Sequence, residues 1–241
     1  PAVVWLMIPA AAVDAELAEL LKLLPAGSVI VDGGNSDYRQ TKLRADVCTQ
    51  AGHSLVDVGT SGGIRGFKDG FSMMIGGSAA AVATIETVIQ ALAQPGGYHH
   101  FGATGAGHFI KMVHNGIEYG VMQAYAEGYR ILHDSHEAPD LDLAAVAGVW
   151  QHGSIIASTI NGLAGEVLAA DAELAGNNGF VAESGEGRWT IETAQAHDIE
   201  VPVMTAALEV RLASQTGRTH FGTRLLAALR QAFGGHPVHR S

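Results

Sequence analysis

Short apolar runs alternate with amphipathic stretches over the first hundred residues. The runs are typical of buried strands and cover Val3–Ile8, Val29–Val31, Ser54–Val58 and Phe71–Ile75, with a last short strand at His100–Phe101. Helical periodicity lies between them, over Asp14–Leu24, about Tyr38–Ala51 and 79–93. This alternation predicts a mostly parallel sheet with helices on both faces.

From His108 onward the pattern is almost entirely helical. Helices are predicted at about 108–134, 140–170, 187–197, 203–215 and 220–233, with a turn at Asn177–Gly179. The chain therefore divides into an α/β domain at 1–107 and an all-α domain at 108–241, with the boundary near Gly107.

Composition narrows the class of protein. Of the 241 residues 47% are apolar and 16% charged, which is typical of an ordered globular protein. The formal net charge of −10 argues against binding nucleic acid or an anionic membrane surface. A lone cysteine, Cys48, suits a reducing cytoplasm. Neither His99-His100 nor the pair His133 and His136 has metal-site spacing, so no metal is expected.

One stretch of the long helical run concentrates reactive side chains. In Lys111-Met-Val-His-Asn-Gly-Ile-Glu-Tyr119, four polar residues stand at i, i+3, i+4 and i+7 and share one helix face: Lys111, His114, Asn115 and Glu118. Such a face can bind a polyhydroxy substrate and supply a general acid and base. A solvated helix face is the alternative if the cluster is taken alone.

The α/β half lacks the glycine turn that cradles a dinucleotide pyrophosphate. No Gly-x-Gly-x-x-Gly follows an N-terminal strand, and the similar Gly102–Gly107 lies at the far end of the domain, where we expect a hinge into the long helix. A complete domain of this type needs two further strand–helix units ahead of Pro1, at about 30 residues each. We therefore expect a partial Rossmann-type sheet with an exposed apolar edge at Val3–Ile8.

Four stretches in order along the chain resemble decarboxylating 6-phosphogluconate dehydrogenase. They are Ile30–Ser36, Gly59–Gly63 with Gly76-Gly77, Gly105–Tyr119 and Gly185–Thr190, and Arg230–His236 resembles the tail of that family. The helical domain resembles the short form of the enzyme. The resemblance implies a helical 6-phosphogluconate-dehydrogenase-like domain after the partial Rossmann-type domain, NAD or NADP as cofactor, and 6-phosphogluconate as substrate in the pentose phosphate pathway.

The resemblance also implies roles for individual residues. Lys111 is the base at the carbon-3 hydroxyl, which requires burial to lower its pKa. Glu118 protonates carbon 1 of the enediol. Asn35 lines the nicotinamide side. Substrate-binding roles fall on Ser61, Gly62, Gly63, His114, Asn115, Tyr119, Arg211, Arg230 and His236.

The phosphate loop departs from the long form of the family. Ser184 and Glu186 stand where the long form has lysine and threonine. An acid facing a phosphate is repulsive, so we expect Arg188 to neutralise Glu186. In the family, Arg230 and His236 reach into the site of a neighbouring subunit, which implies a homodimer or tetramer with Arg211 and this tail pair in different chains.

Two other functions are compatible with the same chain. One is a different β-hydroxyacid dehydrogenase, although that class predicts neither the His-Asn pair after the lysine nor the tail Arg/His pair. The other is a non-catalytic remnant that dimerises or binds a sugar phosphate without turnover.

Overall fold

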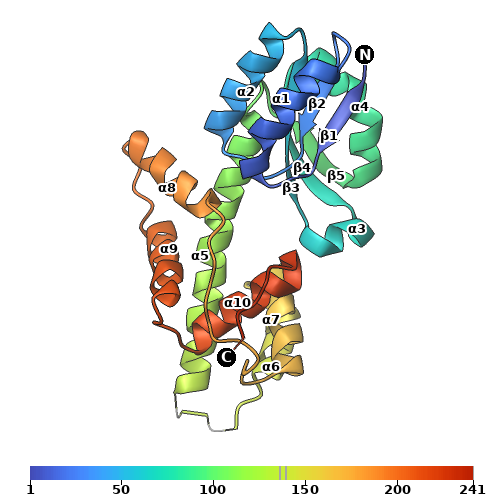
Figure 1. Ribbon diagram of the computed structural model, residues 1–241. Helices are drawn as coiled ribbons and strands as arrows, with labels where there is room; N and C mark the ends of the chain where they lie inside the picture. Colours follow the sequence, from blue (N-terminus) through green and yellow to red (C-terminus); the bar gives the residue numbers. More distant parts are fainter. Residues whose placement is uncertain (136, 139, 241) are drawn as a thin grey trace. The chain divides into compact units, whose positions relative to one another are not determined.

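The computed structural model describes residues 1–135, 137–138 and 140–240 (Figure 1). The chain forms two compact units, Pro1–Asn115 and Gly116–Ser241. Each unit has its own hydrophobic core and is described by itself.

The first unit is built on a five-stranded sheet in the order β1-β2-β3-β4-β5. Its strands are β1 (Val3–Leu6), β2 (Val29–Asp32), β3 (Ser54–Ser61), β4 (Phe71–Gly76) and β5 (Ala93–His100). The pairings β1–β2, β2–β3 and β4–β5 are parallel. The predicted mostly parallel sheet is therefore confirmed, with β1 at one edge.

The exception is the β3–β4 pairing, which is antiparallel. A parallel connection needs a crossover of a dozen or more residues, usually through a helix. Between β3 and β4 the chain has only η2 (Gly63–Arg65) and the single-turn α3 (Gly66–Asp69). This connection is too short to return the chain to the other end of the sheet, so β4 runs back beside β3.

Helices cover both faces of the sheet (Figure 1). On one face, α1 (Val13–Leu23) and α2 (Tyr38–Gln50) pack with Ile30 and Leu55. The short η1 (Ala10–Ala12) directly precedes α1 in the chain. On the other face, α4 (Ala79–Leu92) places Val82, Ile85 and Ile89 against β2, β3 and β4. The predicted helices lie within a residue or two of these bounds.

The last strand was predicted too short. It was expected at His100–Phe101, whereas β5 begins at Ala93 and ends at His100. Pro95 and two glycines lie inside it, and these residues normally argue against a strand. An edge strand tolerates them because only one side of it must complete a hydrogen-bond ladder.

The second unit is helical. Helix α5 (Ala106–Asp134) runs from the first unit into the second, followed by α6 (Leu143–Gln151), α7 (Thr159–Ala170), α8 (Glu186–Ala196), α9 (Pro202–Gln215) and α10 (Phe221–Gly234). The core is formed mainly where α10 packs with α5, α6 and α7, through residues such as Leu225, Tyr129, Ala147 and Leu163.

The helix predicted at 140–170 is in fact two helices. Helix α6 ends at Gln151, because the backbone of His152 is extended and Gly153 has a positive φ of 86°. Ser158 then caps α7 by accepting a hydrogen bond from the Asn161 amide. The break allows α6 and α7 to pack against each other as a pair. Among the described residues, none of the helices is both long and apolar enough to cross a membrane.

Candidate functional site

The first polar cluster lies at the start of α5, within the first unit. Lys111 is only 5% exposed, and its Nζ donates a hydrogen bond of 2.7 Å to Asn115 Oδ1. His114 Nδ1 lies 3.0 Å from the same oxygen and 3.4 Å from Lys111 Nζ. His114 Nε2 lies 3.2 Å from Ser61 Oγ, at the end of β3. The structure therefore brings together four of the predicted site residues from two elements.

Glycine at position 59 allows the lysine to approach the sheet. A Cβ at this position would lie 2.3 Å from Lys111 Cβ and 3.0 Å from the Gly107 carbonyl oxygen. Beyond the end of β3, Gly62 and Gly63 have φ values of 129° and 53°, so they turn the chain sharply beside Ser61. Both glycines are exposed, and their backbone is accessible to a ligand.

Asn35 lies in a tight turn after β2 that is organised by a buried carboxylate. Asp32 accepts hydrogen bonds from Ser36 Oγ (2.7 Å) and from the Gly34 amide (3.2 Å). Arg44 adds an ion pair to Asp32 at 3.4 Å and a second to Asp14 at 2.7 Å. The turn leaves Asn35 exposed.

This geometry fits one end of a dinucleotide. Ligands of doubly wound sheets bind outside the carboxyl ends of parallel strands, where Asn35 stands. The turn is closely packed, since a Cβ at Gly33 would lie 2.1 Å from Trp5 Nε1. The residues present therefore fit the nicotinamide end, whereas the sequence has no glycine turn for the pyrophosphate.

Sequence reasoning missed a buried carboxylate that positions α5. Asp57 of β3 is fully buried, and its two oxygens accept hydrogen bonds from the amides of Gly105 (2.6 Å) and His108 (2.8 Å). These amides belong to the unpaired first turn of the helix, where a negative charge is favourable. His108 Nδ1 also lies 2.8 Å from Thr41 Oγ1. The sequence did offer a signal for this role, because Asp57 is an acidic residue between apolar residues of a strand that leads into a glycine-rich loop.

The second polar cluster lies wholly in the second unit. Arg211 of α9 is 2% exposed, and its Cζ lies 3.3 Å from the centroid of the Tyr119 ring. Burial lowers the pKa of Arg211 to about 10, and the charge of Arg230 acts in the same direction. Glu118, which is half-buried, opposes this shift. The cluster therefore concentrates positive charge in an acidic protein.

Arg230 and His236 belong to the same cluster. Burial lowers the pKa of Arg230, and burial together with the charges of Arg230 and Arg211 lowers the pKa of His236. Gly235 caps α10 in the left-handed conformation, with φ 64°. The chain turns there, and the ring centroids of His236 and Phe233 lie 6.0 Å apart. One chain thus brings this pair to its own Arg211, which differs from the expected division between subunits.

Two glycines allow α8 to lie against α5. A Cβ at Gly187 would lie 2.4 Å from Tyr119 Cε2, and one at Gly116 would lie 2.6 Å from Thr190 Cγ2. The expected pairing of Arg188 with Glu186 is wrong, because Arg188 Nε bonds Glu183 Oε1 at 3.2 Å. Glu186 is instead buried, and its charge acts on Arg211 and Arg230.

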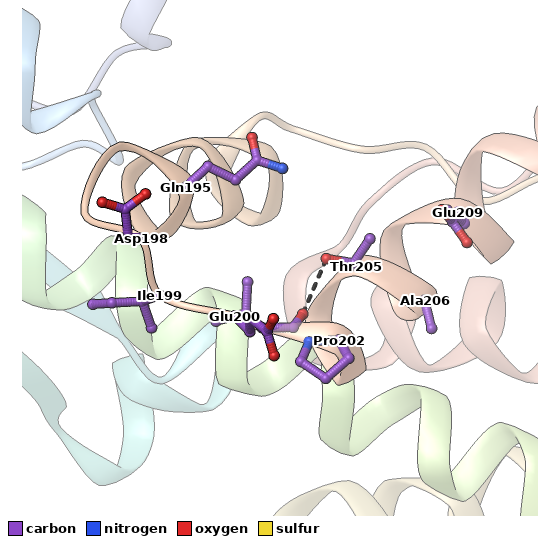
Figure 2. Close-up of a pocket in the computed structure, with 9 residues that line it drawn as sticks. Gln195, Asp198, Ile199, Glu200, Pro202, Thr205, Ala206 and Glu209 are labelled. Atoms are coloured by element: carbon purple, nitrogen blue, oxygen red, sulfur yellow. Dashed lines mark hydrogen bonds between the residues drawn. The ribbon is translucent and has the colours of Figure 1, made fainter.

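A separate open pocket of about 710 Å³ lies between α8 and α9 (Figure 2). Three carboxylates line it, those of Asp198, Glu200 and Glu209, and Thr205 closes one wall by bonding the Val201 carbonyl at 3.0 Å. None of the predicted site residues lines this pocket. Its charge is unsuited to an anionic substrate.

The described part of the chain holds no group of three or more His, Cys, Asp or Glu side chains that could bind a metal. Of the histidine pair considered above, His136 lies outside the described residues, and His133 bonds Asp134 at 2.7 Å.

Comparison with known proteins identifies the family. Residues 2–108 match the NAD binding domain of 6-phosphogluconate dehydrogenase, and residues 107–221 match the C-terminal domain of that enzyme. The chain is 41% identical over 240 residues to YqeC of Bacillus subtilis, whose own assignment as a 6-phosphogluconate dehydrogenase is provisional, and spans 80% of its length. It is 40% identical to the NAD(+)-dependent, decarboxylating 6-phosphogluconate dehydrogenase of Haloferax volcanii, spanning 78% of that protein.

Solved structures of this family and of related dehydrogenases have the same fold. The 6-phosphogluconate dehydrogenase of Plasmodium falciparum superposes with a TM-score of 0.75 and 30% identity, over 90% of this chain and 48% of that one. A 3-hydroxyisobutyrate dehydrogenase of Salmonella typhimurium has the same fold, with a TM-score of 0.70 at 20% identity. With both family domains matched along the chain and relatives of similar length at about 40% identity, this protein belongs to the 6-phosphogluconate dehydrogenase family, in its short form.

Proposed function

We propose that this protein oxidises and decarboxylates 6-phosphogluconate to ribulose 5-phosphate and CO₂, with NAD or NADP as hydride acceptor. The observation that carries the proposal is the buried Lys111, hydrogen-bonded to Asn115 and adjacent to His114. Family membership supports it, as does the name of the Haloferax volcanii relative.

Lys111 acts as the base and then as an acid. In its neutral form the buried Lys111 amine takes the proton of the carbon-3 hydroxyl. The turn that carries Asn35 would hold the nicotinamide end of the cofactor, which would supply the acceptor for the carbon-3 hydride. The ammonium so formed on Lys111 returns its proton to the carbon-3 oxygen as CO₂ leaves. Asn115 Oδ1 orients the lysine throughout.

Other residues hold the substrate and complete the reaction. Ser61 binds the substrate carboxylate with the backbone amides of Gly62 and Gly63, as glycine turns can. His114 and Asn115 bind hydroxyls. Glu118, further along the same helix α5, protonates carbon 1 of the enediol while Lys111, neutral again, takes the proton of the hydroxyl on the former carbon 3, which leaves the ketone. These roles follow from the residue types and their positions in the family pattern.

The phosphate end is assigned to Tyr119, Arg211, Arg230 and His236. Guanidinium groups bind phosphate oxygens through strong charge-assisted hydrogen bonds. In a chain of net charge −10, two buried arginines in one cluster are a specific anion site rather than a general positive field. The predicted homodimer or tetramer stays a prediction, as does the cytoplasmic location.

A different β-hydroxyacid dehydrogenase is the second candidate, because 3-hydroxyisobutyrate dehydrogenases have the same fold. That fold similarity lies below 25% identity and does not identify a substrate. The buried Arg211 and Arg230 favour a phosphorylated substrate over 3-hydroxyisobutyrate.

The deciding experiment offers 6-phosphogluconate and 3-hydroxyisobutyrate separately, with NAD and with NADP. Reduced cofactor, CO₂ and ribulose 5-phosphate are measured together, and Lys111→Met serves as the inactive control. Equal amounts of all three products from 6-phosphogluconate support the proposal. Reduced cofactor without CO₂, or turnover of 3-hydroxyisobutyrate alone, contradicts it. Tight binding of 6-phosphogluconate without any turnover identifies the non-catalytic alternative.

A further inference from the structure

The arginine cluster of the second unit contains an acceptor that an anion site does not need. Glu186 is 6% exposed, and its Oε2 has no hydrogen-bond partner among the described residues. The Tyr119 hydroxyl is also buried without a partner there. The neighbouring Arg188 is engaged by Glu183. A buried polar atom without a partner is costly, so a ligand is the expected source of the missing hydrogen bonds.

The charges around Glu186 define what that ligand can be. Arg211 and Arg230 offer only donors, whereas the Glu186 carboxylate is an acceptor. A group that fits must therefore present negatively charged oxygens to the arginines and one proton donor to Glu186.

We propose that Glu186 makes this subsite select the singly protonated form of a phosphate monoester over the dianion. The P–OH group donates its proton to the Glu186 carboxylate, and the remaining oxygens accept hydrogen bonds from Arg211 and Arg230. The dianion would place an unprotonated oxygen against the carboxylate. This inference rests on the proposed function, because it takes the ligand to be the phosphate end of the substrate.

Four other titratable groups face the cluster. Tyr119 and Glu118 face it from α5, Glu183 from the segment before α8, and His236 from the tail. Burial lowers the pKa of His236 below 6.5, so this imidazole is neutral throughout the range above pH 6.5. A loss of affinity between pH 7 and 8.5 therefore cannot come from the charge of His236.

The test is calorimetric binding of 6-phosphogluconate to the full chain from pH 6 to 8.5. The second phosphate pKa is about 6, so the dissociation constant should rise by about tenfold per pH unit above pH 7. Glu186→Gln should remove this slope and bind at least tenfold more tightly than wild type at pH 8. Glu209→Gln, an exposed acid on α9, is the matched control and should keep the wild-type slope.

Inorganic phosphate and sulfate provide a probe that does not depend on the sugar. Sulfate carries no proton at neutral pH, so the wild-type protein should bind phosphate and reject sulfate, and Glu186→Gln should lose this discrimination. Selective phosphate binding without 6-phosphogluconate binding would support the role of Glu186 and refute the proposed function. A pH slope equal in wild type and Glu186→Gln, or equal binding of phosphate and sulfate by wild type, would refute the role of Glu186 alone.

Discussion

At the scale of single residues, the protein buries a lysine beside polar groups at the start of α5. Lys111 is held by a hydrogen bond to Asn115, and the missing side chain at Gly59 lets its stem pack against β3. Burial of an amine disfavours its protonated, charged form. A general base must be unprotonated before it can take a proton. The position of the Lys111 side chain thus depends on the absence of a side chain at Gly59.

Replacing Lys111 by methionine should abolish oxidation while leaving the affinity for 6-phosphogluconate within a modest factor, because the apolar stem is kept and only the amine is lost. Stopped-flow or steady-state formation of reduced cofactor measures the first effect, and calorimetry the second. Lys68→Met, at the exposed α3, is the control and should behave as wild type. Near-normal turnover by Lys111→Met would remove Lys111 from the mechanism.

Gly59→Ala should reduce kcat at least tenfold. The added methyl group would lie only 2.3 Å from Lys111 Cβ and would therefore displace the amine. The matched control is Gly128→Ala on the same helix as the lysine, where nothing lies within 4 Å of an added Cβ. That control should keep its activity and gain about 0.5–1 kcal/mol of stability, as alanine does over glycine inside a helix. Equal activity of the two variants would mean that Lys111 tolerates displacement.

At the scale of elements, helix ends position the two clusters. Asp57 of β3 caps α5, although more than forty residues separate the two in sequence. It thereby determines where the helix that carries Lys111 begins. At the other end of the chain, His220 caps α10, the helix that carries Arg230. Its side chain accepts a hydrogen bond from the Thr223 amide, and the His220 amide in turn donates one to Thr223 Oγ1. The imidazole can accept only while that nitrogen is unprotonated.

This cap makes stability depend on pH. Burial, and then the charge of Arg130, lowers the pKa of His220 in the folded state. The unfolded chain therefore binds more protons below the normal pKa of 6.5, so the contribution of His220 is complete above pH 6.5 and is lost as the pH falls below it. Denaturant unfolding at pH 7.5 and 5.5 should show this loss.

His220→Asn is the control for that measurement, since asparagine is a good N-cap that does not titrate. It should reduce the dependence of the unfolding free energy on pH between 6.5 and 5.5. Part of the dependence should remain, because the pKa of His236 is lowered in the same sense. An unchanged dependence in His220→Asn would place the responsible group elsewhere.

At the scale of the whole molecule, the first unit has a turn that fits the nicotinamide end of a dinucleotide, and its sequence has no glycine turn for the pyrophosphate. Its sheet has β1 at the edge, with Val3 exposed, and the sequence contains no Gly-x-Gly-x-x-Gly after a strand. Dinucleotide affinity comes largely from backbone amides of that turn and the helix that follows it.

The 241-residue chain should therefore bind NAD and NADP weakly, so that its turnover of 6-phosphogluconate needs a high cofactor concentration, while the substrate itself binds through residues of the chain. Calorimetry with each ligand separates the two. Fusing a segment that carries a pyrophosphate-binding glycine turn to the sheet should raise cofactor affinity, whereas fusing the same segment with the turn glycines replaced should not. Tight NAD binding by the unextended chain would show that another surface holds the pyrophosphate.

The sequence alone predicted most of the elements and the polar face of α5, because hydrophobic periodicity and i, i+3, i+4 spacing are local properties. It also predicted the family, through motifs of adjacent residues. The roles of the site residues stay predictions. Local patterns could not give the antiparallel β4, the break between α6 and α7, or the pairing of Arg188 with Glu183.

These features, and the capping of α5 by Asp57, depend on which groups meet in space. Asp57 meets Gly105 and His108 only because the middle of β3 lies beside the start of α5. Likewise Glu186, Arg211 and Arg230 lie far apart along the chain, and only the packing of α8, α9 and α10 around Tyr119 places one carboxylate among two guanidinium groups. Burial then sets their electrostatics, since the strength of a charge interaction depends on the surrounding solvent, which no sequence pattern records.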